Sequence, residues 1–174
     1  PDPAEMAKTY AEVAQRASRL ISQFVEKKAK SGVNAPSDEL GVAKARRFAA
    51  EAGVAVNYSV ADGDHWHWPR ETYDLVAAIF IQYADPAQRE RLFARMIDAL
   101  KPGGLLVLQG YTPKQLEYKT GGPPILSHLY TEAMLRAAFI GMDLVELRCY
   151  EAELSEGPQH HGRSALVGLV ARKA

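Results

Sequence analysis

The side chains best suited to chemistry lie in two short polar segments. The segment H-W-H-W at 65–68 places two histidines on one face of an extended chain, where their imidazoles could bind a metal ion. The segment near the C-terminus adds His160, His161 and Arg163. Because no carboxylate or cysteine at matching spacing completes a ligand set, we expect no metal site, and no Ser-His-Asp arrangement can be singled out. The two tryptophans of the first segment suit either a ligand pocket or the edge of the core, and we favour the core edge.

Composition limits the class of partner. The chain has 21 Lys and Arg residues against 21 Asp and Glu residues, so no global field attracts nucleic acid or anionic lipid, and a small-molecule ligand is favoured. Cys149 is the single cysteine, which excludes an internal disulfide and fits a reducing compartment such as the cytoplasm. There is no run of about 18 apolar residues and no basic leader before an apolar stretch, so we expect neither a membrane span nor a secretory signal.

The elements that position these residues alternate between helix and strand. A helix is predicted at 37–52, and the alternating V-A-V-N-Y-S-V at 54–60 predicts a strand. The near-continuous apolar run at 73–80 is typical of a strand covered on both faces. Helical spacing of apolar residues at 86–100 is followed by a buried strand at 105–109. The last three elements make a strand-helix-strand unit of parallel type.

The C-terminal part of the sequence predicts one helix and a hairpin. The helix lies at 131–139. Strands at 143–150 and 164–171 are separated by a Gly/Pro/His loop that is long enough for an antiparallel pair. The predicted fold class is therefore α/β, with a mostly parallel sheet that ends in an antiparallel hairpin.

Another helix is predicted at 2–30, where Asp2 can cap it and Pro3 suits its first turn. Its apolar residues recur at steps of four and three and form a narrow seam, made by Met6, Tyr10, Val13, Ala17, Leu20 and Phe24. We expect the seam to pack on the rest of the chain or on a second copy; the alternative is docking to another protein or to an apolar particle. We therefore divide the chain into an amphipathic helix at 1–32 and an α/β domain at 33–174.

Several ordered segments resemble one enzyme family. Y-D-L-V-A-A-I-F at 73–80 and A-L-K-P-G-G-L-L-V-L at 99–108 are common in class I S-adenosylmethionine-dependent methyltransferases. More specific are G-Y-T-P-K-Q-L at 110–116, T-G-G-P-P at 120–124 and E-G-P-Q-H-H-G-R-S-A-L at 156–166. Together, residues 45–174 resemble the tellurite-resistance and thiopurine type of small-molecule methyltransferase. The resemblance implies a Rossmann-like sheet with S-adenosylmethionine bound across the carboxyl ends of its strands.

The resemblance also implies roles for single residues. Asp62 matches the acidic position that accepts a hydrogen bond from the adenine amino group, although an Asp before Gly63 also suits a plain turn. Ile79 and Phe80 match positions that line the methionine end of the donor, and they also suit a plain core. Residues on the expected substrate side are Gln82, Tyr111, His160 and Arg163, among which no general base is assigned.

The first strand and glycine-rich cofactor loop of this family are not found ahead of these segments. The front of the chain, 1–45, instead resembles the N-terminal region of class I polyhydroxyalkanoate synthases, at A-E-M-A-K-T-Y (4–10) and S-G-V-N-A-P-S-D-E-L-G (31–41). No Gly-x-Cys-x-Gly nucleophile elbow is present, so polyester synthesis by this chain is excluded. We therefore expect a junction, natural or introduced, near 41–45.

The expected loss of that strand has consequences for assembly and activity. It leaves the apolar strand at 73–80 at a sheet edge, which invites pairing, so we predict a homo-oligomer formed through this strand or through the N-terminal seam. The leading function is a methyltransferase that acts on a small acceptor, and the missing loop argues against activity. The alternative is a non-catalytic interaction or polyester-granule-associated protein that uses the N-terminal helix.

Overall fold

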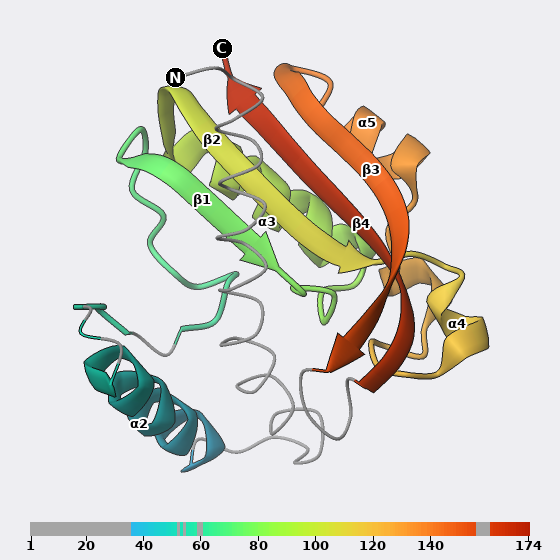
Figure 1. The fold of residues 1–174 in the computed structure, drawn as a ribbon. Coiled ribbons are helices and arrows are strands. Elements are labelled where there is room, and N and C mark those ends of the chain that lie inside the picture. The colour runs from blue at the N-terminus through green and yellow to red at the C-terminus, as the bar shows by residue number, and fades with distance from the viewer. Residues whose placement is uncertain (1–35, 52, 54, 59–60, 156–160) are drawn as a thin grey trace.

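A computed structural model of the chain describes residues 36–51, 53, 55–58, 61–155 and 161–174. The described strands form one sheet in the order β1-β2-β4-β3 (Figure 1). β1 (Tyr73–Ile79) runs parallel to β2 (Leu100–Tyr111), whereas β4 (His161–Lys173) pairs antiparallel with β2 and with β3 (Met142–Ser155). This mixed sheet and its helices confirm the α/β fold class. The helix predicted at 2–30 lies outside the described residues.

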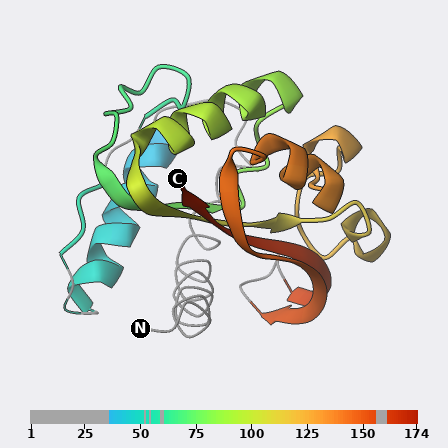
Figure 2. The same cartoon turned by 90° about the horizontal axis from the view of Figure 1, so that it is seen from above.

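α3 (Pro86–Ala99) joins β1 to β2 and begins where the sequence predicts. The Asp85 side chain accepts a hydrogen bond from the Gln88 amide at 2.8 Å, and Pro86 stands in the first turn, where a missing amide is tolerated. The helix buries Leu92, Phe93, Met96 and Ala99. Figure 2 shows α3 and α5 (Glu132–Ala138) on the same side of the sheet. β1, α3 and β2 therefore form the predicted parallel strand-helix-strand unit.

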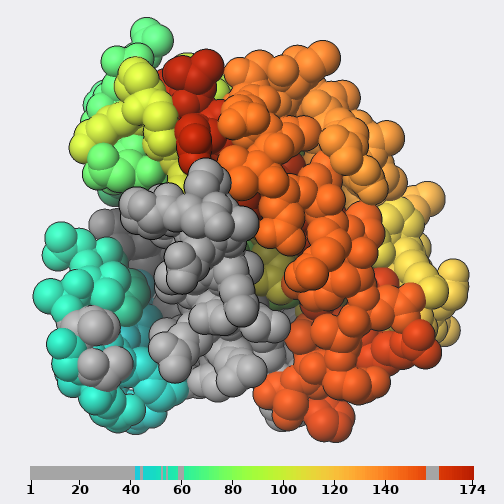
Figure 3. Space-filling model, turned by 45° about the horizontal axis from the view of Figure 1, so that its top comes forward, coloured from blue at the N-terminus to red at the C-terminus, as the bar shows by residue number. Residues whose placement is uncertain are grey.

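β3 and β4 form a long hairpin that extends past the predicted strands at both ends. Their register places Met142 opposite Lys173 and Ser155 opposite His161. β4 is largely buried between its neighbours, but β3 is the outer strand and exposes many of its side chains, including that of Cys149. Figure 3 shows β3 running down the right-hand part of one face of the molecule.

The main core lies between the sheet and the two helices on one side of it. α5 is capped by the Thr131 hydroxyl, which accepts a hydrogen bond from the Met134 amide at 3.2 Å. Its Leu135 is fully buried. Three aromatic rings fill the space between the helices and the strands, namely Phe93, Tyr130 and Phe139. The shorter helices α4 (Gln115–Tyr118) and η1 (Leu126–His128) lie in the connection from β2 to α5.

The predicted strand at 54–60 is wrong for the part that the structure describes, since 55–58 are not in a strand. Alternation is a local signal, and a strand also needs a neighbouring strand with which to pair. Here the Tyr58 hydroxyl instead donates to the Ala45 carbonyl oxygen of α2 (Pro36–Glu51) at 3.2 Å, and Val56 is half exposed. α2 itself confirms the helix expected at 37–52.

Two differences in the sheet follow. Since 55–58 are not in a strand, one pairing among the described strands is parallel and two are antiparallel, so the described sheet is mixed rather than mostly parallel. β1 is then an edge strand of the described sheet, and it is not covered on both faces along its length. Tyr73 and Ala77 are exposed, whereas Ala78 and Ile79 are buried. None of the helices in the described part of the chain is long and apolar enough to span a membrane.

Candidate functional site

The carboxyl ends of β1 and β2 meet at one edge of the sheet, because the two strands are parallel. Just past β1, Phe80 has a φ of 50°, a left-handed conformation that costs a bulky residue about 1 kcal/mol. Two contacts hold it there. Its amide donates to the Gln109 carbonyl oxygen at 2.9 Å, and its ring stacks on that of Tyr111 with centroids 4.7 Å apart. The chain therefore turns sharply away from the sheet at this point.

Gln82 joins the two strand ends from within. Its side-chain oxygen accepts a hydrogen bond from the Tyr111 amide at 2.6 Å, and its side-chain nitrogen donates to the carbonyl oxygens of Tyr111 and His128 at 2.9 and 3.1 Å. His128 returns the contact, since its Nδ1 lies 2.9 Å from the Gln82 carbonyl oxygen. Because a carbonyl only accepts, Nδ1 carries the proton in this contact. The side-chain amide of Gln82 is thus fully engaged in hydrogen bonds with backbone groups.

Asp62 folds its own loop into a tight turn beside this edge. Its Oδ1 accepts a hydrogen bond from the Asp64 amide at 2.8 Å, and its Oδ2 lies 3.1 Å from Nδ1 of His65. The Asp64 amide first, and then His65, hold the pKa of the Asp62 carboxyl below its usual range. The side chain is nevertheless 57% exposed. The turn-forming interpretation of Asp62 is therefore correct, and it leaves the carboxylate available to a ligand.

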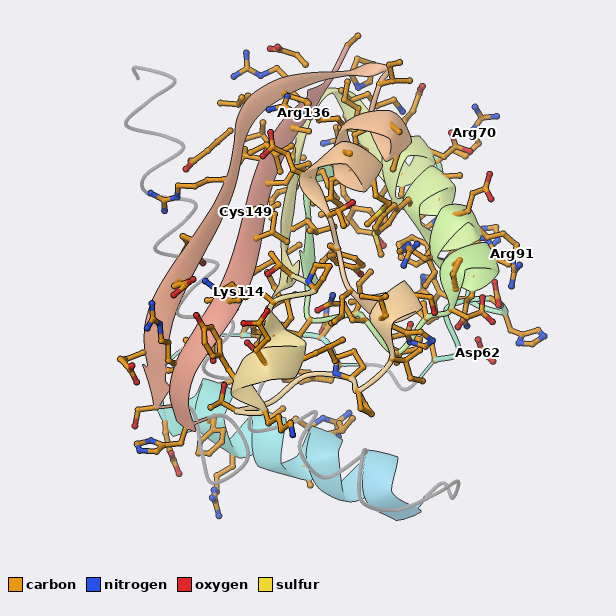
Figure 4. All side chains as sticks on the ribbon, turned by 90° about the vertical axis from the view of Figure 1, so that its right-hand side faces the viewer. Asp62, Arg70, Arg91, Lys114, Arg136 and Cys149 are labelled. Atoms are coloured by element: carbon orange, nitrogen blue, oxygen red, sulfur yellow. The ribbon has the colours of Figure 1, made fainter. Side chains whose placement is uncertain are left out.

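The Asp62 turn packs closely on the middle of α3 and on the segment that follows β1. A Cβ atom added at Gly63 would lie 2.7 Å from Leu92 and 3.3 Å from the Tyr83 hydroxyl. Trp68 donates from its indole nitrogen to the Gly63 carbonyl oxygen at 3.1 Å and packs against the main core, as the core-edge interpretation predicts. Figure 4 shows Asp62 near Arg91, and well away from Lys114.

Arg163 belongs to a second cluster, at the junction of the β3–β4 hairpin with α4. Its Nε donates to the Glu151 carboxylate at 2.7 Å, and Lys114 pairs with the same carboxylate. Both cations also lie over the ring of Tyr118, at 5.4 and 5.7 Å from its centroid. The hydrogen bonds from Lys114, Tyr118 and Arg163 lower the pKa of Glu151 to about 2.

The structure thus separates the residues that the sequence singles out. Phe80, Gln82 and Tyr111 meet at the carboxyl edge of β1 and β2, but Gln82 and Tyr111 are almost fully buried. Ile79 is 3% exposed and packs with Leu105, Val107 and Val170, so it serves as a core residue here. Arg163 lies in the other cluster, and His160 lies outside the described residues.

His128 was not found by sequence reasoning. It stands in the 126–130 segment L-S-H-L-Y between β2 and α5. Nothing local marks it, however, because its partner Gln82 lies 46 residues earlier.

A family model described as a methyltransferase domain matches residues 11–104, which is more than half of the chain. The chain belongs to this methyltransferase-domain family. The match begins at residue 11 and so includes most of the segment that resembles the synthases; none of these comparisons supports that second resemblance. No curated protein matches the chain.

Solved methyltransferase structures share the fold. TehB from Haemophilus influenzae is 13% identical with a TM-score of 0.59, over 78% of this chain and 47% of TehB. A SAM-dependent methyltransferase from Methanosarcina mazei is 15% identical with a TM-score of 0.59, over 81% of this chain and 79% of the other. The N-methyltransferase NodS from Bradyrhizobium japonicum, in complex with S-adenosyl-L-homocysteine, is 15% identical with a TM-score of 0.56, over 80% and 63%. The chain thus spans about half of TehB.

Proposed function

We propose that this protein binds S-adenosylmethionine and transfers its methyl group to a small-molecule acceptor. Family membership and the fold shared with NodS in its S-adenosyl-L-homocysteine complex support the reaction class. The observation that carries the proposal is the half-exposed Asp62 carboxylate, in a turn that packs close to Tyr83 just past the carboxyl end of β1. In open α/β sheets, ligands bind outside the carboxyl ends of the strands.

The residues at this edge fit such a donor in chemical terms. Each Asp62 oxygen is engaged once within the turn, which leaves acceptor capacity for an amino group. Phe80 offers a partly buried aromatic surface, held in place by Tyr111. The donor, when bound, supplies an electrophilic methyl group, and the contribution of the chain is to bind and orient the reactants, because proximity supplies much of the rate of such transfers.

A small acceptor fits the balanced charge of the chain. With 21 residues of each sign, no extended field favours a polyanion such as nucleic acid. The acceptor would be recognised by local groups near the same edge of the sheet.

Binding of S-adenosylhomocysteine tests the proposal without knowledge of the acceptor. Calorimetric titration of the full chain should give a dissociation constant on the order of micromolar. Asp62→Asn should weaken binding roughly tenfold, because a hydrogen bond to a charged acceptor is worth about 1.5 kcal/mol or more. Asparagine can still accept from the Asp64 amide, so the turn should persist.

Asp143→Asn, at an exposed carboxylate of β3, is the matched control and should leave the affinity unchanged. Circular dichroism checks that each variant is folded. A folded wild-type chain that shows no heat of binding would overturn the proposal. That result would favour the non-catalytic alternative, in which the predicted N-terminal seam contacts a partner or a polyester granule.

A further inference from the structure

Two arginines on α3 form hydrogen bonds with the loop that contains Asp62. Arg91 donates from Nε and Nη2 to the two carboxylate oxygens of Asp64, at 3.0 and 2.8 Å. Arg95, one helical turn later, donates from Nη1 to the Gly63 carbonyl oxygen at 2.7 Å and to Asp64 at 3.2 Å. A two-point arginine-carboxylate contact fixes orientation as well as distance.

These contacts reach Asp62 through the next two residues, Gly63 and Asp64. The Asp64 carboxylate is held by Arg91, and the Asp64 amide donates to Oδ1 of Asp62 at 2.8 Å. The backbone of Gly63, which joins the two aspartates, is held by Arg95 and by Trp68 at the same carbonyl oxygen. The direction of the Asp62 carboxylate therefore depends on side chains that do not touch it.

The Asp64 carboxylate of this pairing is partly shielded, although the side chain of Arg91, which makes the two-point contact, is 52% exposed. The side chain of Asp64 is 23% exposed, and that of Arg95 is 33% exposed. Isolated exposed pairs contribute little to stability, whereas ideal two-point geometry in a network contributes more. The hydrogen bond from Arg91 holds the pKa of Asp64 below its usual range, so the carboxylate stays charged near neutral pH.

We propose that Arg91 and Arg95 are positioning residues for the methyl-donor site, which hold the 61–68 loop so that Asp62 presents its carboxylate at the carboxyl end of β1. This inference rests on the proposed function. Sequence reasoning did not find these arginines, although their spacing of four on a helix that follows the loop was a visible signal.

Affinity for S-adenosylhomocysteine is the first measurement. Arg91→Ala and Arg95→Ala should each weaken binding about fivefold to tenfold, which corresponds to about 1–1.4 kcal/mol. Arg91→Lys keeps the charge but loses the second hydrogen bond, so it should restore only part of the affinity. The matched control is Arg136→Ala, which removes another half-exposed arginine-carboxylate pair, with Glu132 on α5, and should change nothing.

A double-mutant cycle separates positioning from plain stability. In an Asp62→Asn background, Arg91→Ala should have little further effect, because the residue through which Arg91 acts is already altered. If the two losses simply add, Arg91 does not act through Asp62 and the proposal is wrong. A loss of affinity that only follows a lower melting temperature would contradict it equally.

The loop can also be followed without any ligand, because the two tryptophans of the chain both lie in it. Arg95→Ala and Arg91→Ala should increase acrylamide quenching of the tryptophan emission, and Arg136→Ala should not. If quenching is unchanged in the two α3 variants, Arg91 and Arg95 do not hold the 61–68 loop in place. If wild type fails to bind S-adenosylhomocysteine, the proposed function fails and the positioning role falls with it, whereas quenching still decides whether the arginines hold the loop.

Discussion

At Glu151 a single carboxylate accepts hydrogen bonds from Lys114 and Arg163, and both cations lie over one tyrosine ring. The three charged residues come from the segment before α4 and from the two strands of the hairpin. Because a network of charges constrains more chain than an isolated pair does, this cluster holds the far end of the hairpin against α4.

The lowered pKa of Glu151 predicts how stability depends on pH. The pKa is about 2 in the folded chain against 4.5 ordinarily, so the unfolded chain binds this proton first as pH falls. The stabilisation is therefore complete above about pH 4.5 and is lost as pH falls toward 2. Glu151→Gln should destabilise the protein at neutral pH, and the difference from wild type should shrink across that window.

Denaturant unfolding at a series of pH values measures this difference. Glu117→Gln, at an exposed carboxylate of α4, serves as the control. A Glu151→Gln deficit that stays constant from pH 7 to the acid limit of the folded state would show that the carboxylate charge is not responsible.

At the scale of elements, two glycines on paired strands should respond in opposite ways to alanine. A Cβ added at Gly110 of β2 would lie 2.8 Å from the ring of Tyr130 and 2.9 Å from the Gln82 oxygen. Both neighbours are fully packed, so we expect Gly110→Ala to lower the free energy of unfolding by about 1–3 kcal/mol. In β4, a Cβ at Gly168 would meet only Tyr150, at an ordinary 3.8 Å.

Gly168→Ala should therefore raise the free energy of unfolding by about 0.5–1 kcal/mol, because alanine loses less conformational freedom on folding. Gly168 stands opposite Gln109, the neighbour of Gly110, so the two changes probe almost the same part of the sheet. Chemical denaturation of both variants makes the comparison. If both variants change the free energy of unfolding by equally small amounts, the Gln82 side chain between β1 and β2 can shift to accommodate the added Cβ atom at little cost.

The same elements show what the sequence could predict. α3 and α5 carry local start signals in Asp85 and Thr131, and β1, β2 and the hairpin are continuous or alternating apolar runs, so all of them were found. The strand predicted at 54–60 was not, because alternation says nothing about whether a partner strand is available. The hydrogen bonds of Gln82 could not be predicted from local sequence for a related reason, since its partners lie 29 and 46 residues away.

At the scale of the whole molecule, the sheet that the structure describes is open along β1. Its outer edge carries the exposed Ala77 and the partly buried Leu75 and Val76, with few charges to discourage pairing. We expect self-association through this edge or through the predicted N-terminal seam, and the exposed residues of β1 allow a direct test at the edge.

Ala77→Lys places a charge on that edge and should shift the protein toward monomer in sedimentation velocity at high concentration. Ile140→Lys removes a highly exposed apolar side chain elsewhere, after α5, and should leave the distribution unchanged. A wild-type chain that is monomeric at all concentrations would exclude the edge as an interface. Equal responses of the two variants would indicate nonspecific hydrophobic association.

The place of Cys149 has a practical consequence. It is the single cysteine of the chain and lies exposed on β3, at the opposite edge of the sheet from β1. Both tryptophans lie in the loop that Asp62 begins, so an acceptor dye on Cys149 would receive energy from that loop alone. Partial desolvation raises the pKa of the thiol, so labelling is best done at mildly alkaline pH. Energy transfer from the tryptophans to a dye on Cys149 therefore reports the distance between the 61–68 loop and β3, and it requires no substitution.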